Sequence, residues 1–224
     1  MFLYETHLHT FPASACATAL SYAQVRAYKD RGYAGIIVTD HFINGNSSCP
    51  SGLTWEEKMT FLVRGYEDAK VEGDLCGLDV FFGFEFCVGD IEFLTYGLTP
   101  ALLYQTPGLD RMGIKEFSAF VRRAGGYLAQ AHPYRKAPWI AKSEPVDPRL
   151  IDGMEVFNAG DLGADSNKKA EKFARLHNIP MQTGTDSHHE QLTFVSGIGL
   201  KKRAESIEDV IKAIKNREVE LIKD

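Results

Sequence analysis

Two histidines near the start of the chain have the spacing of half a metal site. His7 and His9 follow Phe2, Leu3 and Tyr4, whose apolar side chains predict a strand. Side chains at positions i and i+2 of a strand point to the same face, so both imidazoles can reach one centre. Imidazole binds divalent transition metals. The alternative is a pair of solvent-exposed histidines near a terminus, and only the rest of the chain can decide between the two.

Histidines and carboxylates also follow the other predicted strands. Six of the seven histidines lie at or just after strand ends, and only His177 lies on a predicted helix. Imidazole with carboxylate is the ligand set of Zn, Mn or Fe, whereas calcium would require oxygen ligands. One metal takes three or four protein ligands, so a larger set predicts two or three metals, with Glu85 and Asp186 as bridging carboxylates. The expected ligands are His7, His9, His41, Glu85, His132, Asp186 and His188.

Strands and helices alternate along the whole chain, which implies β-α units and a mostly parallel sheet. Strands are expected at 2–4, 35–41, 79–88, 91–97, 127–131, 153–158, 180–186 and 197–200. Helices are expected at 19–31, 55–71, 115–123, 167–176 and 206–216. About seven such units form either an open doubly wound sheet or a closed barrel. Both architectures place functional loops at the carboxyl ends of the strands, where the histidines and carboxylates are found.

The composition is that of an ordinary globular protein. The 224 residues are 44% hydrophobic and carry a formal net charge of −5, without a block of Lys and Arg. This argues against a dedicated face for long nucleic acids. The four cysteines contain no C-x-x-C pair and are expected to be reduced. Without a secretory signal or an apolar run of membrane-spanning length, we expect a cytoplasmic protein that does not contact a membrane.

At these residues the sequence resembles the polymerase-and-histidinol-phosphatase (PHP) superfamily of metal-dependent phosphoesterases. Five short motifs carry the resemblance, in the family's order and spread over most of the chain. They are His7-x-His9, Thr39-Asp40-His41, Gly83-Phe84-Glu85, Ala131-His132-Pro133 and Gly184-Thr-Asp-Ser-His188. The resemblance implies a single-domain α/β fold over residues 1–224, a distorted (β/α)7 barrel similar to a TIM barrel. It also implies up to three metals at the carboxyl ends of its strands.

The sequence departs from the family pattern at two places. Many members carry an Asp or His shortly after the first motif, but residues 11–16 contain no strong oxygen ligand. Cys16 could serve a soft metal there, although a buried small residue is the better interpretation. Many members also carry a histidine where this chain has Glu92, and a carboxylate can replace it as a ligand. The metal between His41 and His188 is therefore expected to be weakly held or completed by water.

The expected function is hydrolysis of a small-molecule or nucleotide phosphate ester by a metal-activated hydroxide at a di- or trinuclear site. Asp186, His188 and Arg135 are the expected catalytic residues. Arg135 would bind the phosphate, or would be an ordinary solvated loop arginine. His188 or a metal-bound water would protonate the leaving group. The cofactors would be two or three Zn, Mn or Fe ions.

Three other functions use similar residues. The first is exonuclease-like hydrolysis of short oligonucleotides. The second is a catalytically idle metal-binding module that regulates a partner. The third is metal-dependent hydrolysis of a C–N bond. The expected partner is a small phosphate ester, and the sequence leaves the oligomeric state open.

Overall fold

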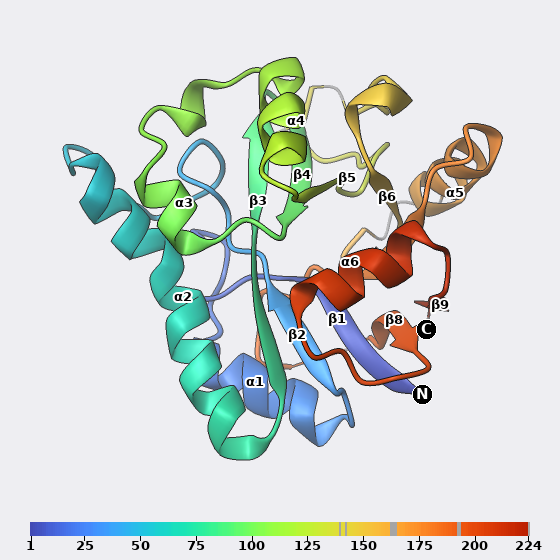
Figure 1. Ribbon diagram of the computed structural model, residues 1–224, viewed down its shortest axis with the longest axis horizontal. Coiled ribbons are helices and arrows are strands. Elements are labelled where there is room, and N and C mark those ends of the chain that lie inside the picture. The colour runs from blue at the N-terminus through green and yellow to red at the C-terminus, as the bar shows by residue number, and fades with distance from the viewer. Residues whose placement is uncertain (139, 142, 162–164, 192–193, 224) are drawn as a thin grey trace.

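The protein has an α/β fold built on one nine-stranded sheet that curls into a nearly closed barrel (Figure 1). The computed structural model describes residues 1–138, 140–141, 143–161, 165–191 and 194–223. The strand order is β7-β6-β5-β4-β3-β2-β1-β8-β9. The strands are β1 Phe2–Leu8, β2 Gly35–Val38, β3 Asp79–Val88, β4 Ile91–Tyr96, β5 Tyr127–Gln130, β6 Gly153–Asn158, β7 Met181–Gly184, β8 Ser196–Leu200 and β9 Glu220–Lys223.

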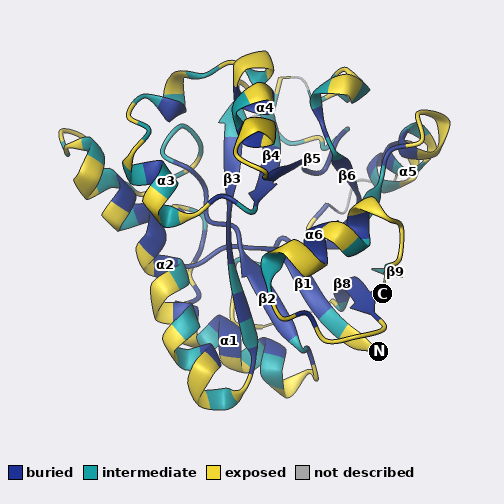
Figure 2. Ribbon diagram, in the orientation of Figure 1, coloured by how far each residue is buried: buried dark blue, intermediate teal, exposed yellow. Residues whose placement is uncertain are grey.

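Helices cover the sheet from outside and leave their polar faces in solvent (Figure 2). The α-helices are α1 Ser21–Asp30, α2 Trp55–Cys76, α3 Pro100–Tyr104, α4 Ile114–Arg123, α5 Ser166–Leu176 and α6 Ile207–Lys215. Thr54 and Glu57 form a capping box at the start of α2. Val210, Ile211 and Ile214 of α6 join the buried cluster around Tyr4 and Tyr127, which lie near the starts of β1 and β5. The helix α6 therefore packs toward the amino ends of the strands.

The sheet is not a repeat of seven β-α units, so the (β/α)7 count is not confirmed. The strands β1, β2 and β3 are parallel, as are β5, β6 and β7. The strand β4 runs antiparallel between β3 and β5 because Gly89 and Asp90 form a tight hairpin turn. The strands β8 and β9 add an antiparallel edge beside β1.

Backbone hydrogen bonds join β1 to the segment after β7 and nearly close the barrel. The amide of Asp186 donates to the carbonyl oxygen of His7 at 2.8 Å, and the amide of His9 donates to that of Ser187 at 2.9 Å. Deeper in the barrel, the hydroxyl of Thr6 donates to the carbonyl oxygen of Thr183 at 2.9 Å. The ends of the first and seventh strands therefore meet at the carboxyl side, where the candidate ligands lie.

Most predicted elements are confirmed to within a few residues, with α2 extending to Cys76 and β2 ending at Val38. The sequence missed α3 and β9. After β5, residues 131–138, 140–141 and 143–147 form no helix or strand, and a short 3-10 helix, Pro148–Leu150, follows. All four cysteines are free. Within the described residues, no helix combines the length and apolarity that crossing a membrane requires.

Candidate metal centre

All eight expected ligands converge at the carboxyl ends of the strands. They form four overlapping groups, and in each group the potential ligand atoms lie within 4.8 Å of one another. The groups are His7–Glu85–His132, His7–His9–Asp186, His41–Glu85–Glu92 and His9–His41–His188. Because Glu85, His7, His9 and His41 each belong to two groups, the four groups form one continuous cluster rather than separate sites. Glu92, which stands where the family pattern has a histidine, lies within it.

Glu85 lies at the middle of the cluster and turns its two oxygens toward different histidines. Its Oε1 is 3.1 Å from Nε2 of His132 and 3.3 Å from Nε2 of His7. Its Oε2 is 3.0 Å from Nδ1 of His41 and 3.5 Å from Nε2 of His9. A carboxylate in this arrangement can bridge two metal ions, as the sequence predicts for Glu85.

Asp186 faces the cluster with only one oxygen. Its Oδ1 is 3.2 Å from Nε2 of His9 and 3.4 Å from Nε2 of His7. Its Oδ2 accepts hydrogen bonds from the guanidinium of Arg135 and from the side-chain amide of Asn158. In this structure, the geometry therefore suits a ligand oriented by Arg135 better than the expected bridge.

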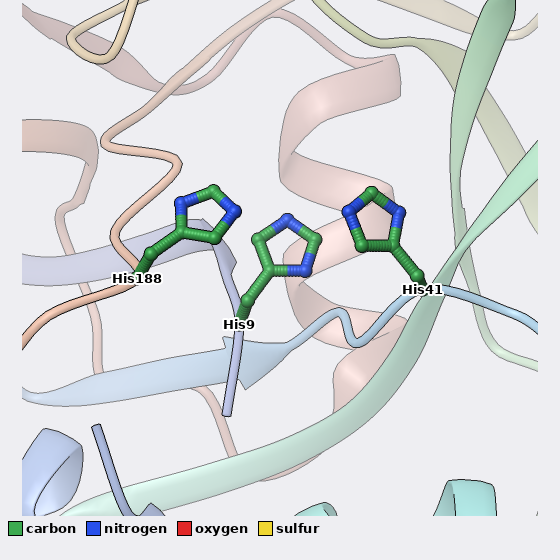
Figure 3. A group of neighbouring side chains, drawn as sticks. All are labelled: His9, His41 and His188. Atoms are coloured by element: carbon green, nitrogen blue, oxygen red, sulfur yellow. The ribbon is translucent and has the colours of Figure 1, made fainter. Parts of the chain in front are cut away.

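Three imidazoles lie side by side at one end of the cluster (Figure 3). His9 lies between His41 and His188, and its ring centroid is 4.4 Å from each of theirs. These residues follow β1, β2 and β7, so three distant parts of the chain supply them. Burial alone would raise the pKa of the Cys16 thiol, but its interactions with His188 and His41 lower it to about 7.

Hydrogen bonds from outside the cluster set the orientation of its imidazoles. Nδ1 of His7 lies 2.9 Å from a carboxylate oxygen of Glu155. The hydroxyl of Ser14 donates to Asp40 at 2.7 Å and lies 3.1 Å from Nδ1 of His9. In both rings these contacts favour a proton on Nδ1 and leave Nε2 as the lone-pair donor toward the cluster.

The cluster keeps its central carboxylates ionised. Burial alone would raise the pKa of Glu85, but the positive charges of His7 and His41 hold it well below its usual value. Burial likewise opposes ionisation of Asp186, and His7 and Arg135 outweigh it and lower the pKa. Burial would lower the pKa of His7, but Asp186, Glu155 and Glu85 raise it. The carboxylates therefore require positive charge, which protons supply here and metal ions can supply equally.

Two buried atoms show that the residues fit metal ions. Nδ1 of His41 and Oε2 of Glu85 have no hydrogen-bond partner among the described residues. They approach each other to 3.0 Å, but their alignment does not make a hydrogen bond. An unsatisfied buried polar atom is costly. A divalent cation between the histidines and carboxylates would satisfy both atoms.

The structure also shows supporting residues that the sequence did not identify. Glu5 is fully buried and accepts hydrogen bonds from the amides of Thr6, His7 and Thr185 through one oxygen. Ser14, described above, is equally buried. Alternation along β1 places Glu5 on the same face as His7, which was the available signal. Nothing in the local sequence pointed to Ser14, because its partners lie elsewhere in the chain.

The two remaining histidines lie outside the cluster, as expected. His177, the histidine on a predicted helix, is exposed and packs its ring on Phe173 with centroids 4.3 Å apart. His189 is also exposed, and its Nδ1 lies 2.7 Å from the hydroxyl of Thr18.

Comparison with known proteins identifies the fold. No protein-family model matches the chain, and no curated protein matches its sequence. Among solved structures, the chain is similar to a two-domain protein from Bacteroides vulgatus that contains a predicted PHP-like metal-dependent phosphoesterase. The TM-score is 0.76 and the identity 14%, and the match covers 99% of this chain and 64% of that protein. The chain therefore spans less than two thirds of that relative.

Two further structures share the fold. PsfC from Pseudomonas syringae has a TM-score of 0.71 at 14% identity, covering all of this chain and 91% of PsfC. An amidohydrolase from Chromobacterium violaceum, with bound sulfate and no metal, has a TM-score of 0.59 at 14% identity, covering 97% of each chain. At this identity the likeness is one of fold. The resemblance to PHP-like proteins that the five motifs predicted is thus confirmed at the level of fold.

Proposed function

We propose that the chain is a metal-dependent phosphoesterase that hydrolyses a small-molecule or nucleotide phosphate ester at a di- or trinuclear site. The observation that carries this proposal is the continuous cluster of eight ligands around Glu85. Its four overlapping groups exceed what one ion needs, since a single metal takes three or four protein ligands. The phosphoesterase named in a protein of the same fold supports the reaction class.

Divalent metals bound here would supply a hydroxide near neutral pH and would neutralise charge on the phosphoryl oxygens. The chain supplies the geometry. Glu155 and Ser14 fix the rings of His7 and His9 before substrate arrives, so their Nε2 atoms need no reorganisation. Nδ1 of His188 lies 2.6 Å from the carbonyl oxygen of Asp186, which leaves its Nε2 available for a ligand or a proton.

Arg135 would bind the phosphate. Its guanidinium is held at the edge of the cluster by Asp186 and by Asn158, whose Oδ1 lies 3.0 Å from Nη2. Arginine presents several parallel donors, so it can keep these contacts while another N–H faces a phosphate oxygen. In this proposal a metal-bound water, or His188 if its Nε2 holds no metal, would protonate the leaving alkoxide. We also propose that residues 1–224 act as one domain.

The test is hydrolysis of a panel of phosphate esters by protein loaded with Mn²⁺, Zn²⁺ or Fe²⁺. The change Asp186→Asn should lower kcat by at least about a hundredfold, because it removes a charged ligand that Arg135 orients. The matched control is Glu190→Gln, an exposed carboxylate after the same strand, which should leave the rate unchanged. Hydrolysis that is indifferent to a chelator, or equal in the two variants, would refute the proposal.

One observation favours a second candidate, hydrolysis of a C–N bond, because a protein of the same fold is named an amidohydrolase. Adding amides to the same panel separates the two activities. Elemental analysis separates both from the idle metal-binding module, since two or three metals per chain favour an enzyme and none or one favours the module. Short oligonucleotides in the panel test the exonuclease-like alternative.

A further inference from the structure

Asn158, the last residue of β6, lies between Arg135 and the carboxylates beside it. Its side chain is fully buried. Its Oδ1 accepts a hydrogen bond from Nη2 of Arg135 at 3.0 Å. Its Nδ2 donates to Oε2 of Glu155 at 2.9 Å and to Oδ2 of Asp186 at 3.3 Å. One amide group therefore contacts one cation and two carboxylates at the same time.

These three contacts require an amide at position 158 and fix the direction in which it faces. The oxygen of an amide can only accept, and its nitrogen can only donate. If the amide of Asn158 were rotated by half a turn, its oxygen would face the two carboxylates and its nitrogen would face the guanidinium. An ionised aspartate would have no donor for either carboxylate. Only one orientation of asparagine satisfies all three charged groups.

The helix α5 holds Asn158 in place through a second asparagine. Oδ1 of Asn167 accepts from the backbone amide of Asn158 at 3.0 Å, and Nδ2 of Asn167 donates to the carbonyl oxygen of Asn158 at 3.1 Å. The space around the Asn158 side chain is also narrow, because a Cβ atom added at Gly160 would lie 3.2 Å from its Oδ1. The amide is therefore fixed before any ligand binds.

The contacts of Arg135 use only one of its nitrogens. Nη2 donates both to Oδ1 of Asn158 and to Oδ2 of Asp186, which accounts for its two hydrogens. A guanidinium has five N–H donors, and the remaining three lie on Nη1 and Nε. Within the part of the chain that the structure describes, these three have no hydrogen-bond acceptor. Without Asn158, the guanidinium would keep a single contact and could turn about it.

We propose that Asn158 is a positioning residue for phosphate binding and acts through Arg135. It fixes Nη2, so that the N–H groups of Nη1 and Nε are presented to a phosphate at the metal cluster. The inference rests on the proposed function and deepens it. Asn158 itself would contact neither the metals nor the phosphate. Its effect on phosphate binding should therefore depend on the presence of Arg135.

A double-mutant cycle of Asn158→Ala and Arg135→Ala tests this independently of turnover. Methylphosphonate, which is not hydrolysed, is titrated calorimetrically into each protein at saturating Mn²⁺. Each single change should weaken binding by about tenfold or more, as expected for a hydrogen bond to a charged group. The double variant should bind within about twofold of Arg135→Ala. A merely structural role would weaken binding in both backgrounds.

The matched control is Asn178→Gly, which removes a similar contact from the surface. Oδ1 of Asn178 accepts from Nη2 of Arg217 at 2.9 Å, and glycine suits the positive φ of 53° at this position. This variant should bind methylphosphonate as the wild type does. Circular dichroism verifies folding. Asn167→Ala, which only loosens the backbone of Asn158, is a second measurement and should weaken binding by roughly threefold.

Two results would overturn the inference. The first is wild-type affinity for methylphosphonate in Asn158→Ala. The second is an equal loss of affinity from this change with and without Arg135. If the wild-type protein binds no methylphosphonate at all, the result counts against the phosphoesterase proposal, and with it against the inference.

Discussion

Buried hydrogen-bond acceptors orient individual imidazole rings of the metal cluster. Glu155 fixes His7, and Asp40 acts on His9 through the hydroxyl of Ser14. The amide of His41 also donates to this hydroxyl, at 3.0 Å. A single serine therefore links the loop after β1 to the imidazole of His9 and to the backbone of His41. Its loss should affect the cluster although it is not itself an expected ligand.

The change Ser14→Ala tests this role. It leaves the buried Nδ1 of His9 and the amide of His41 without their partner, which should lower the free energy of unfolding by about 1–3 kcal/mol. Loss of an orienting partner should weaken metal affinity by about ten- to a hundredfold. Chemical denaturation and competition with a chelating dye measure the two effects. Ser51→Ala, at an exposed loop position, is the control. Equal metal affinity in both variants would contradict the assigned role.

Glu5 gives the metal-free protein a specific pH dependence. Burial raises its pKa from 4.5 to about 7. Between these values the folded protein holds a proton that the unfolded chain releases, so the free energy of unfolding falls as pH rises. The full contribution is about 3 kcal/mol. In Glu5→Gln this group cannot titrate, while the amide oxygen can keep the three backbone hydrogen bonds.

The measurement is urea denaturation of both proteins in chelator at pH 4.5 and pH 8. The stability of Glu5→Gln relative to wild type should increase between the two values. If the free energy of unfolding of wild type and of Glu5→Gln changes equally with pH, Glu5 does not titrate in this range.

At the scale of secondary-structure elements, the sequence predicted which side chains meet at the carboxyl side of the barrel because strand ends are local features. Alternation in β1 placed His7 and His9 on one face. The Gly89–Asp90 turn brings Glu92 opposite Cys87 on the strand that carries Glu85, and both carboxylates reach one group of ligands. Residues whose role depends on distant partners could not be predicted in this way. Ser14 acquires its role from Asp40, and the bond between Arg135 and Asp186 was not foreseen although Arg135 was expected at the site. The short strand β9 was missed because its four residues carry little periodic pattern.

The helix α2 packs closely against the site at Gly65, which has no side chain. A Cβ atom added at Gly65 would lie 2.3 Å from both Oδ2 of Asp40 and the hydroxyl of Thr10. Alanine favours helices by about 1 kcal/mol over glycine. The clash should nevertheless dominate in Gly65→Ala and reduce stability by about 1–3 kcal/mol. It should also weaken metal binding, because Asp40 must move.

Thermal unfolding with and without metal checks this expectation. Gly113→Ala, where an added Cβ would meet no atom within 4 Å, should change stability by only about 0.5 kcal/mol. A Gly65→Ala protein that is more stable than wild type would show that the side chains of Asp40 and Thr10 can shift to make room for the methyl group at little cost in free energy.

At the scale of the whole molecule, the metal cluster joins the strand β7 at one edge of the sheet to strands as distant as β1, so metal binding should stabilise the barrel between them. Metal at a hundred times its dissociation constant adds about 2.7 kcal/mol per site. For a protein of this size the Tm should rise by roughly 5–10 °C. In Glu85→Gln, which keeps the side chain's size, most of this gain should disappear. Scanning calorimetry with and without chelator measures it, and an equal gain in both proteins would exclude Glu85 as a shared ligand.

The hydrogen bonds that join β1 to the segment after β7 also bear on how the protein is made. His7 and Asp186 meet at this junction, although the chain between them includes most of the fold. While the ribosome is still translating the middle of the chain, the nascent polypeptide carries His7, His9 and His41 but lacks Asp186 and His188. Any ion captured at that stage would be held incompletely and could exchange. The metal ion that stays bound is therefore selected only after synthesis has passed His188, when Asp186 and His188 are both present.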